Sequence, residues 1–345
     1  MHTLYREIQE QPAILSALLE REAEPARLLA EKLRQYQPRL AMIVARGTSD
    51  NAAIYGKYLL ESFAGLPVAL AAPSLYTLYG RPPRLEHALV IGVSQSGQSP
   101  DLVEVMHEAR RQGALTVAVV NERQSPLAEG ADHVLWCGAG KEVAVAATKS
   151  FTSQQLLMAL LAAEWSGAPE LTESLSAVPA AAAGALKLDG GMRDLAHRWR
   201  DLGSCLVLAR GYAYAAALEV ALKIKETSYL MADAYSGADF LHGPIAVIEP
   251  GFPALLLGAS GPAMEGMNDL AITLRDRGAD TAAITNDPAL AASVDTAFSL
   301  NEVASEALAP ISLAVAGQLL AYHLAVAKGY DPDQPRGLRK VTSTR

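Results

Sequence analysis

The most constraining feature of the sequence is that its second half repeats its first. Residues 41–47, AMIVARG, resemble residues 205–211, CLVLARG, and residues 110–121, RRQGALTVAVVN, resemble residues 275–286, RDRGADTAAITN. Both pairs have an offset close to 164 residues, so the similarity is collinear. In each half, short β-branched runs alternate with helical patterns. Such alternation predicts two α/β domains, each with a parallel sheet and helices on both faces.

The same patterns suggest where each domain begins and ends. We expect a helical lead-in at 1–35, a first domain at 36–167, a connection at 168–190, a second domain at 191–328 and a C-terminal tail at 329–345. The expected strands are 41–46, 67–71, 88–93, 115–120 and 133–136 in the first half, and 205–209, 253–257, 280–284 and 296–300 in the second.

Composition excludes several classes of protein. Half of the 345 residues are hydrophobic and 19% are charged, which is typical of a compact globular chain. The net charge of −8 argues against a broad nucleic-acid surface. Two cysteines, Cys137 and Cys205, cannot form a disulfide scaffold, and we expect both to be buried thiols. The seven histidines lack ligand spacing, so we expect no metal or other cofactor.

One segment is long and apolar enough to cross a membrane. Residues 307–327 contain no Asp, Glu, Lys or Arg, but they are rich in Ala and include Pro310, Gly317, Gln318 and His323. A helix buried in a core or a subunit interface is the better interpretation. Since the N-terminus has no signal-peptide pattern, we expect a soluble, cytoplasmic protein without a membrane partner.

Small polar residues follow two strands of the first half. The first strand leads into RGTSDN, with Gly47, Thr48 and Ser49, and the third leads into SQSGQS and a helix. This second turn supplies Ser94, Gln95, Ser96 and Ser99. A serine-rich helix cap is the alternative, but two such turns on one sheet edge favour an anion site built from hydroxyls and helix N–H groups. The matching turns of the second half, RGYAYAA and GASGPAM, lack most of these hydroxyls.

The second half carries an unusual charged helix instead. Glu219, Lys223 and Glu226 fall at i, i+4 and i+7, on one face of a helix that is otherwise largely apolar. A solvated row of ion pairs is the alternative, yet a surface helix would have a polar outer face. Buried, mutually perturbing groups of this kind suit proton transfer. His242 follows in a loop, where it could be structural or catalytic.

These motifs resemble the sugar isomerase (SIS) family, and more closely the isomerase half of glucosamine-6-phosphate synthase. The resemblance runs from about residue 40 to the end and includes RGTSDNA, SQSGQSPD, VAATKSFTSQ, ALEVALKIKETSY, FLHGPIAVIEP and DQPRGLRKVT. It implies two flavodoxin-like domains, a homodimer, and a phosphosugar site shared between the subunits.

The resemblance also implies a role for each residue. Ser94, Gln95, Ser96 and Ser99 would hold the sugar phosphate, assisted by Ser49, and Gly47, Thr48, Val145 and Ala147 would complete the substrate site. Glu226 would move a proton between C1 and C2, supported by Glu219 and Lys223. His242 would open the sugar ring from the neighbouring subunit, and Lys340 would form a Schiff base with the keto sugar.

The departures from the synthase pattern bear on the reaction. Ala147 replaces a serine of the motif, and the ending KVTSTR differs from that of the synthase. The synthase has a glutaminase domain before this region, whereas about 40 residues precede the first strand here. We therefore expect a glucosamine-6-phosphate deaminase. The alternatives are a deaminase, deglycase or isomerase for another amino sugar phosphate, such as galactosamine 6-phosphate or fructosamine 6-phosphate, a glutaminase-less transaminase-like isomerase, and a non-catalytic phosphosugar sensor.

Overall fold

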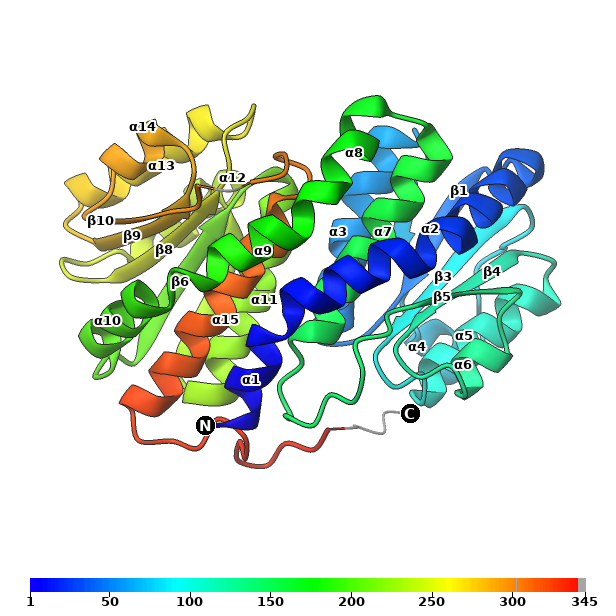
Figure 1. The fold of residues 1–345 in the computed structure, drawn as a ribbon, viewed down its shortest axis with the longest axis horizontal. Helices are drawn as coiled ribbons and strands as arrows, with labels where there is room; N and C mark the ends of the chain where they lie inside the picture. Colours follow the sequence, from blue (N-terminus) through cyan, green and yellow to red (C-terminus); the bar gives the residue numbers. More distant parts are fainter. Residues whose placement is uncertain (302, 341–345) are drawn as a thin grey trace. The chain divides into compact units, whose positions relative to one another are not determined.

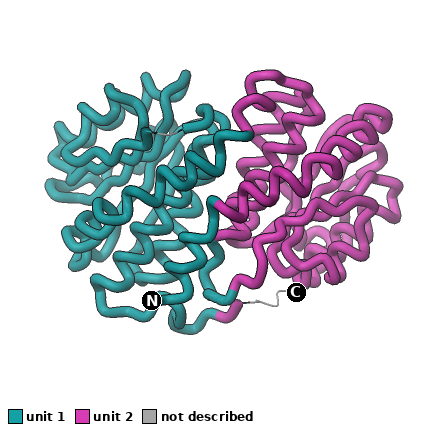
Figure 2. The backbone as a smooth tube through the Cα atoms, viewed as in Figure 1, with its two compact units in different colours: residues 1–12, 143–148, 176–338 teal, residues 13–142, 149–175, 339–345 magenta. Residues whose placement is uncertain are grey.

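The computed structural model describes residues 1–301 and 303–340. The chain divides into two compact units (Figure 2). Unit 1 comprises residues 1–12, 143–148 and 176–338, and unit 2 comprises residues 13–142 and 149–175 together with residues 339 and 340. Each unit contains one parallel sheet of five strands, so the predicted fold class is confirmed.

The sheet of unit 2 is built from the first half of the repeat. Its strands are β1 (Leu40–Val44), β2 (Val68–Leu70), β3 (Ala88–Ser94), β4 (Leu115–Val120) and β5 (His133–Trp136), in the order β2-β1-β3-β4-β5 (Figure 1). All neighbours are parallel. This is the flavodoxin-like order, in which the switch point lies between β1 and β3.

Helices cover both faces of this sheet because its strands are apolar on both sides. On one face, Met42, Val44 and Val90 pack against α5 (Pro100–Arg111) and α6 (Pro126–Glu129). The other face is covered by α3 (Thr48–Phe63) and α7 (Lys149–Ser166), which pack against each other where Gly56 meets Met158. The unit also contains α4 (Ser74–Thr77), α8 (Pro169–Ser174) and most of α2 (Gln11–Tyr36).

The sheet of unit 1 repeats the arrangement. Its strands are β6 (Ser204–Ala209), β7 (Met231–Ser236), β8 (Pro253–Gly258), β9 (Asp280–Thr285) and β10 (Thr296–Ser299), in the order β10-β9-β8-β6-β7. Strand β7 is missing from the sequence prediction. It lies at the edge of the described sheet and exposes Met231 and Asp233, so its pattern is not the apolar run of a central strand.

Helices also pack around this second sheet. Met267, Leu270 and Leu274 of α13 (Met264–Asp276) pack against Leu206 and Leu256 of the strands. The other helices are α1 (Thr3–Gln9), α9 (Val178–Leu186), α10 (Asp189–Trp199), α11 (Tyr214–Ser228), α12 (Gly237–Leu241), α14 (Pro288–Ala292) and α15 (Ala309–Ala327), with 3-10 turns η1 (Leu175–Ala177), η2 (Gly211–Ala213) and η3 (Pro244–Val247).

Helix α15 is the apolar segment that the sequence marks as a possible membrane span. Of the helices in the described part of the chain, it alone is long and apolar enough to cross a membrane. Within its most apolar stretch of 18 residues, 89% is buried inside the structure. It packs against α11, α10, α9 and α1. It is thus a core helix of unit 1, as predicted, and Cys137 and Cys205 are buried thiols, also as predicted.

Candidate functional site

The two hydroxyl-rich turns lie side by side in unit 2. Strands β1 and β3 are parallel neighbours, so the turns that follow them meet at the same edge of the sheet, at its switch point. An ion pair joins them: Arg46 Nε lies 2.8 Å from Oδ2 of the buried Asp101, in the first turn of α5. Sequence analysis missed this pair, although Arg46 stands directly before the Gly-Thr-Ser motif.

Hydrogen bonds give the turn after β3 a defined shape. Ser94 Oγ accepts a bond from the Gly97 N–H at 3.0 Å, and Ser96 Oγ accepts one from the Gln98 N–H at 3.3 Å. Gly97 has φ +62°, and a Cβ there would lie 2.1 Å from Ser125 Oγ, so only glycine fits. Among the described residues, the Ser99 side chain makes no cap bond to α5. The serines therefore do not act simply as helix caps.

The turn after β1 is supported by a distant helix. Gly47 precedes α3 with φ +54° and ψ −130°, a conformation that favours glycine. The Ser49 hydroxyl is buried and accepts a hydrogen bond from Gln154 Nε2 of α7 at 3.0 Å. Gln95, Ser96 and Ser99 of the other turn stay partly accessible. The edge thus combines hydroxyls and helix N-termini, which can bind an anion.

Lys340 joins unit 2 through a buried carboxylate. Its Nζ lies 2.8 Å from Oε2 of Glu142, whose side chain is 0% exposed. The same carboxylate accepts bonds from the Ser150 N–H at 3.1 Å and from Ser150 Oγ at 2.7 Å, at the start of α7. The sequence prediction does not include Glu142 as the partner of Lys340. Its only sequence signal is its position, three residues before the motif VAATKSFTSQ.

The charged row predicted on one helix is present on α11 of unit 1. The Lys223 ammonium lies 3.4 Å from Glu219 and 2.5 Å from Glu226. The side chains of Glu219 and Lys223 are 0% and 2% exposed, so the alternative of a solvated row is wrong for these two residues. The Glu226 side chain is 24% exposed. It is the accessible end of a buried row of charges, and the member best placed to exchange a proton with a bound molecule.

His242 is separate from this row within the described residues. It lies at the C-terminal end of α12 and is exposed, and no hydrogen bond or ion pair joins it to Glu226 in the described part of the chain. Val145 and Ala147 lie in residues 143–148 of unit 1, in a segment without helix or strand. Both are partly accessible, whereas Ala144 before them and Ala146 between them are buried.

The two copies of the fold therefore carry different chemistry. The first provides the hydroxyl turns and Glu142, which pairs with Lys340 of the C-terminal tail. The second provides the charged row of α11 and the exposed His242. Among residues 1–301 and 303–340, no group of three or more His, Cys, Asp or Glu side chains is placed to hold a metal ion.

Comparison with known proteins identifies related chains. The SIS domain family model matches residues 36–164 and 200–328. The glutamine–fructose-6-phosphate aminotransferase (isomerizing) of Methanothermobacter thermautotrophicus is 34% identical over 344 residues, and that of Aeropyrum pernix is 37% identical over 363 residues. Each alignment covers 99% of this chain, and the chain spans 57% of the length of each relative.

Solved structures show the same fold. A proposed phosphosugar isomerase from Silicibacter pomeroyi is 36% identical, with a TM-score of 0.87 over 96% of this chain and 100% of that chain. The C-terminal domain of glucosamine-fructose-6-phosphate aminotransferase from Francisella tularensis is 28% identical, with a TM-score of 0.87 over 97% of this chain and 98% of that one. A glucosamine-6-phosphate deaminase from Thermotoga maritima, 21% identical with a TM-score of 0.78 over 99% of this chain and 100% of that chain, shares the fold alone.

Proposed function

The chain belongs to the SIS domain family, and we propose that it is a glucosamine-6-phosphate deaminase, which converts this amino aldose phosphate and water to fructose 6-phosphate and ammonia. The observation that carries the proposal is the buried charged row of α11, which ends in the accessible carboxylate of Glu226. Aldose–ketose chemistry needs one base that takes a proton from one carbon and returns it to the next.

In the proposed reaction, the turns after β1 and β3 bind the phosphate through Ser94, Gln95, Ser96 and Ser99, assisted by Ser49. His242 opens the sugar ring. Glu226 then takes the proton from C2 of the open-chain amino aldehyde and returns it to C1. The C1 oxygen gains a proton and the nitrogen loses one, which leaves an imine at C2.

Water attacks that imine carbon, and the nitrogen leaves as ammonia after it has gained protons. Lys340 can hold the same carbon as a Schiff base before hydrolysis, because an amine exchanges with an imine nitrogen.

The assembly that this reaction needs is a further part of the proposal. We expect a homodimer in the cytoplasm, in which His242 of each subunit serves the site of its partner. Support comes from the segment that carries this histidine, since His242 is exposed together with the apolar Leu241 and Val247. Exposed apolar side chains grouped on one segment are typical of a surface that another subunit covers.

A second candidate is the reverse direction, the amination of fructose 6-phosphate. It is favoured by the relatives at 34% and 37% identity, which carry the name aminotransferase (isomerizing). The same base and the same phosphate site would serve both directions. Supply of ammonia, rather than a change in the residues of this chain, would then decide which direction operates.

The deciding experiment is to incubate the protein with glucosamine 6-phosphate, without glutamine, and to measure ammonia and fructose 6-phosphate together. Equal release of both products supports the deaminase, and Glu226→Gln should then lower kcat at least about a hundredfold. Formation of glucosamine 6-phosphate from fructose 6-phosphate and ammonium, with no measurable release, supports the second candidate. Phosphosugar binding without turnover in either direction would contradict both and indicate a sensor.

A further inference from the structure

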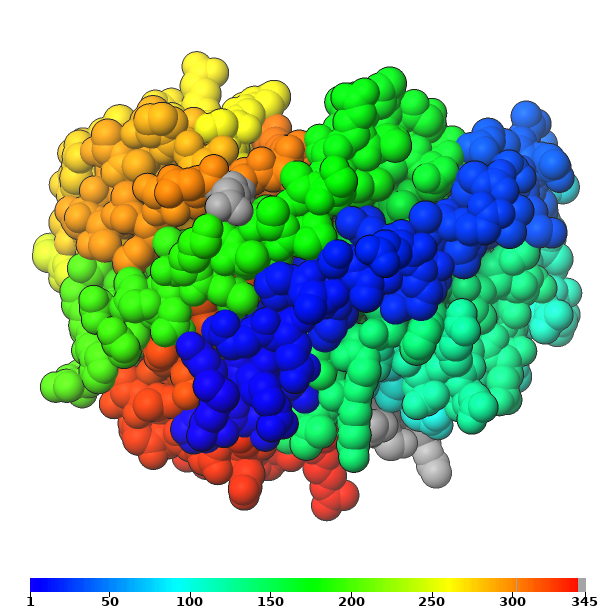
Figure 3. Space-filling view, in the orientation of Figure 1, coloured from blue at the N-terminus to red at the C-terminus, as the bar shows by residue number. Residues whose placement is uncertain are grey.

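The segment 143–148 contains two of the expected substrate-binding residues but no helix or strand of its own. A segment outside helices and strands keeps one conformation only if other groups satisfy its N–H and C=O groups. Those groups come from the N-terminal helices and from α15, all within unit 1. The N-terminal residues lie along the visible face in Figure 3, drawn in blue.

Glu7 holds the start of this segment. It lies on α1 between the core residues Leu4 and Ile8, and it is 1% exposed. Its carboxylate accepts hydrogen bonds from the Val143 N–H at 2.5 Å and from the Ala144 N–H at 3.2 Å. A buried carboxylate is costly unless it is hydrogen-bonded, and bonds to a charged acceptor are stronger than neutral ones. This arrangement therefore fixes two adjacent peptide groups.

A pair of glutamines holds the end of the segment. Gln318 is a buried polar residue of the apolar helix α15, and its Nε2 donates to the Thr148 carbonyl at 3.4 Å. Its Oε1 accepts from Gln11 Nε2 at 2.8 Å, and Gln11 also donates to the Ile8 carbonyl at 3.0 Å. The end of α1 and the start of α2 thus orient the α15 amide that holds Thr148.

We propose that Glu7, Gln11 and Gln318 are positioning residues for substrate binding. Glu7 fixes the start of the segment that presents Val145 and Ala147, and the two glutamines fix its end. Between the fixed ends, side chains alternate: Val143, Val145 and Ala147 are accessible, while Ala144, Ala146 and Thr148 are buried. A shift of the segment by one residue would exchange the two sets. The proposal gives α1 and the start of α2 a role in positioning the substrate-binding segment. Its predicted effect on KM rests on the proposed function.

The first test compares Glu7→Ala, Glu7→Gln and the control Glu10→Gln. Glu10 lies just after α1 and forms an ion pair with Arg6, and its side chain is more exposed than that of Glu7. Glu7→Ala should raise KM for glucosamine 6-phosphate at least about tenfold and change kcat less than about threefold. The reason is that the segment contributes equally to binding of the substrate and of the transition state. Glu7→Gln keeps one oxygen acceptor and should fall between Glu7→Ala and the unchanged protein. An unchanged KM in Glu7→Ala, or an equal rise in Glu10→Gln, would overturn the proposal.

A second readout does not depend on any enzymatic activity. Amide hydrogen exchange of the peptide covering residues 143–148 should become at least about tenfold faster in Glu7→Ala and in Gln318→Met, but not in Glu10→Gln. Faster exchange in a protein that shows no turnover would uphold the positioning role and reject only the proposed function. Exchange that accelerates equally throughout unit 1 would instead mean that Glu7 merely stabilises the fold, and the positioning role would be rejected.

Discussion

At the scale of single residues, the buried ammonium of Lys223 depends on nearby carboxylates. It lies between Glu219 and Glu226 in the interior of unit 1. Loss of one member of a buried ion pair costs more than the pair contributes, since it leaves an uncompensated charge in a medium of low dielectric constant.

We therefore predict that Lys223→Met lowers the free energy of unfolding by about 3–5 kcal/mol. Glu226→Gln should cost less than about 1 kcal/mol, because the Lys223 ammonium keeps Glu219 as a charged partner at 3.4 Å and the side chain at position 226 is 24% exposed. Denaturant unfolding of the two variants checks this. A loss of less than about 1 kcal/mol in Lys223→Met would mean that the row is solvated, contrary to the structure.

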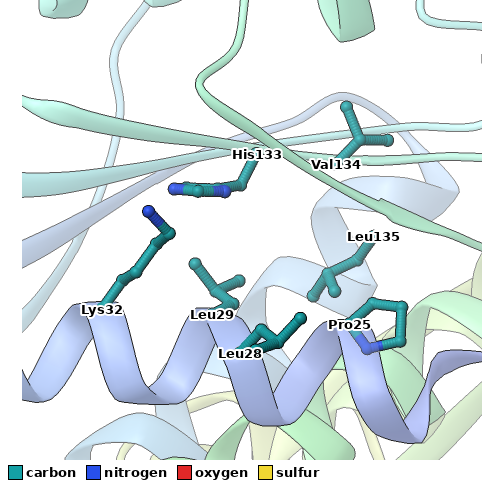
Figure 4. Close-up of a pocket in the computed structure, with 7 residues that line it drawn as sticks. All are labelled: Pro25, Leu28, Leu29, Lys32, His133, Val134 and Leu135. Carbon is teal, nitrogen blue, oxygen red and sulfur yellow. The ribbon is translucent and has the colours of Figure 1, made fainter.

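His133 provides a pH-dependent prediction in unit 2. It lines a pocket of about 280 Å³ between α2 and β5, beside Leu29 and Lys32 (Figure 4). Burial lowers the pKa of His133 from 6.5, and the charge of Lys32 lowers it further, against the opposing effect of Asp132. The unfolded chain therefore binds a proton at a higher pH than the folded protein does.

The free energy of unfolding should accordingly fall as the pH drops from about 6.5 toward the lowered pKa of the folded state. His133→Gln cannot be protonated, so it should lose less stability than the unchanged protein between pH 7.5 and 5.5. Denaturant unfolding at these two pH values measures the difference. The same loss in both proteins would exclude His133 as its source.

At the scale of elements, close approach of two helices positions the charged row. A Cβ at Gly317 of α15 would lie 2.0 Å from Cγ2 of Val220, the residue that follows Glu219 on α11. We predict that Gly317→Ala destabilises the protein by about 1–3 kcal/mol through overpacking. Val220→Ala should relieve part of that loss, giving a coupling energy of about 0.5–3 kcal/mol in a double-mutant cycle. Additive losses would contradict the close packing.

The turn after β3 allows a similar comparison between two glycines. Gly97 and Gly65 have φ of +62° and +64°, but a Cβ at Gly97 would lie 2.1 Å from Ser125 Oγ, whereas no described atom lies within 4 Å of one at Gly65. Gly65→Ala should cost about 1–2 kcal/mol from backbone strain alone. Gly97→Ala should cost more in denaturant unfolding and weaken phosphosugar binding in calorimetry. Equal costs would show that Ser125 moves aside freely.

At the scale of the whole molecule, the duplication made most of the fold predictable. A collinear repeat of apolar runs indicates two similar sheets, and residue types at strand ends indicate which copy binds an anion. The supporting contacts were not predictable, because they join positions far apart in the chain: Glu142 with Lys340, and Glu7 with Val143. The sequence alone does not distinguish a carboxylate that binds backbone N–H groups from one that faces solvent.

The same duplication raises the question of how many phosphosugars one chain binds. In unit 1, the turn after β8 corresponds to the turn after β3, but its surroundings are acidic. A Cβ at Gly261 would lie 2.2 Å from Glu306 Oε2, and Glu306 accepts a hydrogen bond from the Ala263 backbone at the start of α13. Ser260 Oγ donates to Asp287 at 3.3 Å. Two carboxylates therefore occupy the place where an anion would bind in this copy.

We predict that calorimetric titration with fructose 6-phosphate gives one site per chain rather than two. Ser96→Ala should weaken that binding at least about tenfold, because it removes a hydroxyl from the turn of unit 2. Ser260→Ala, the matched change in unit 1, should leave it unaltered. Two sites per chain, or weaker binding in Ser260→Ala, would mean that the carboxylates move away when ligand binds, and that the two copies have kept a common function.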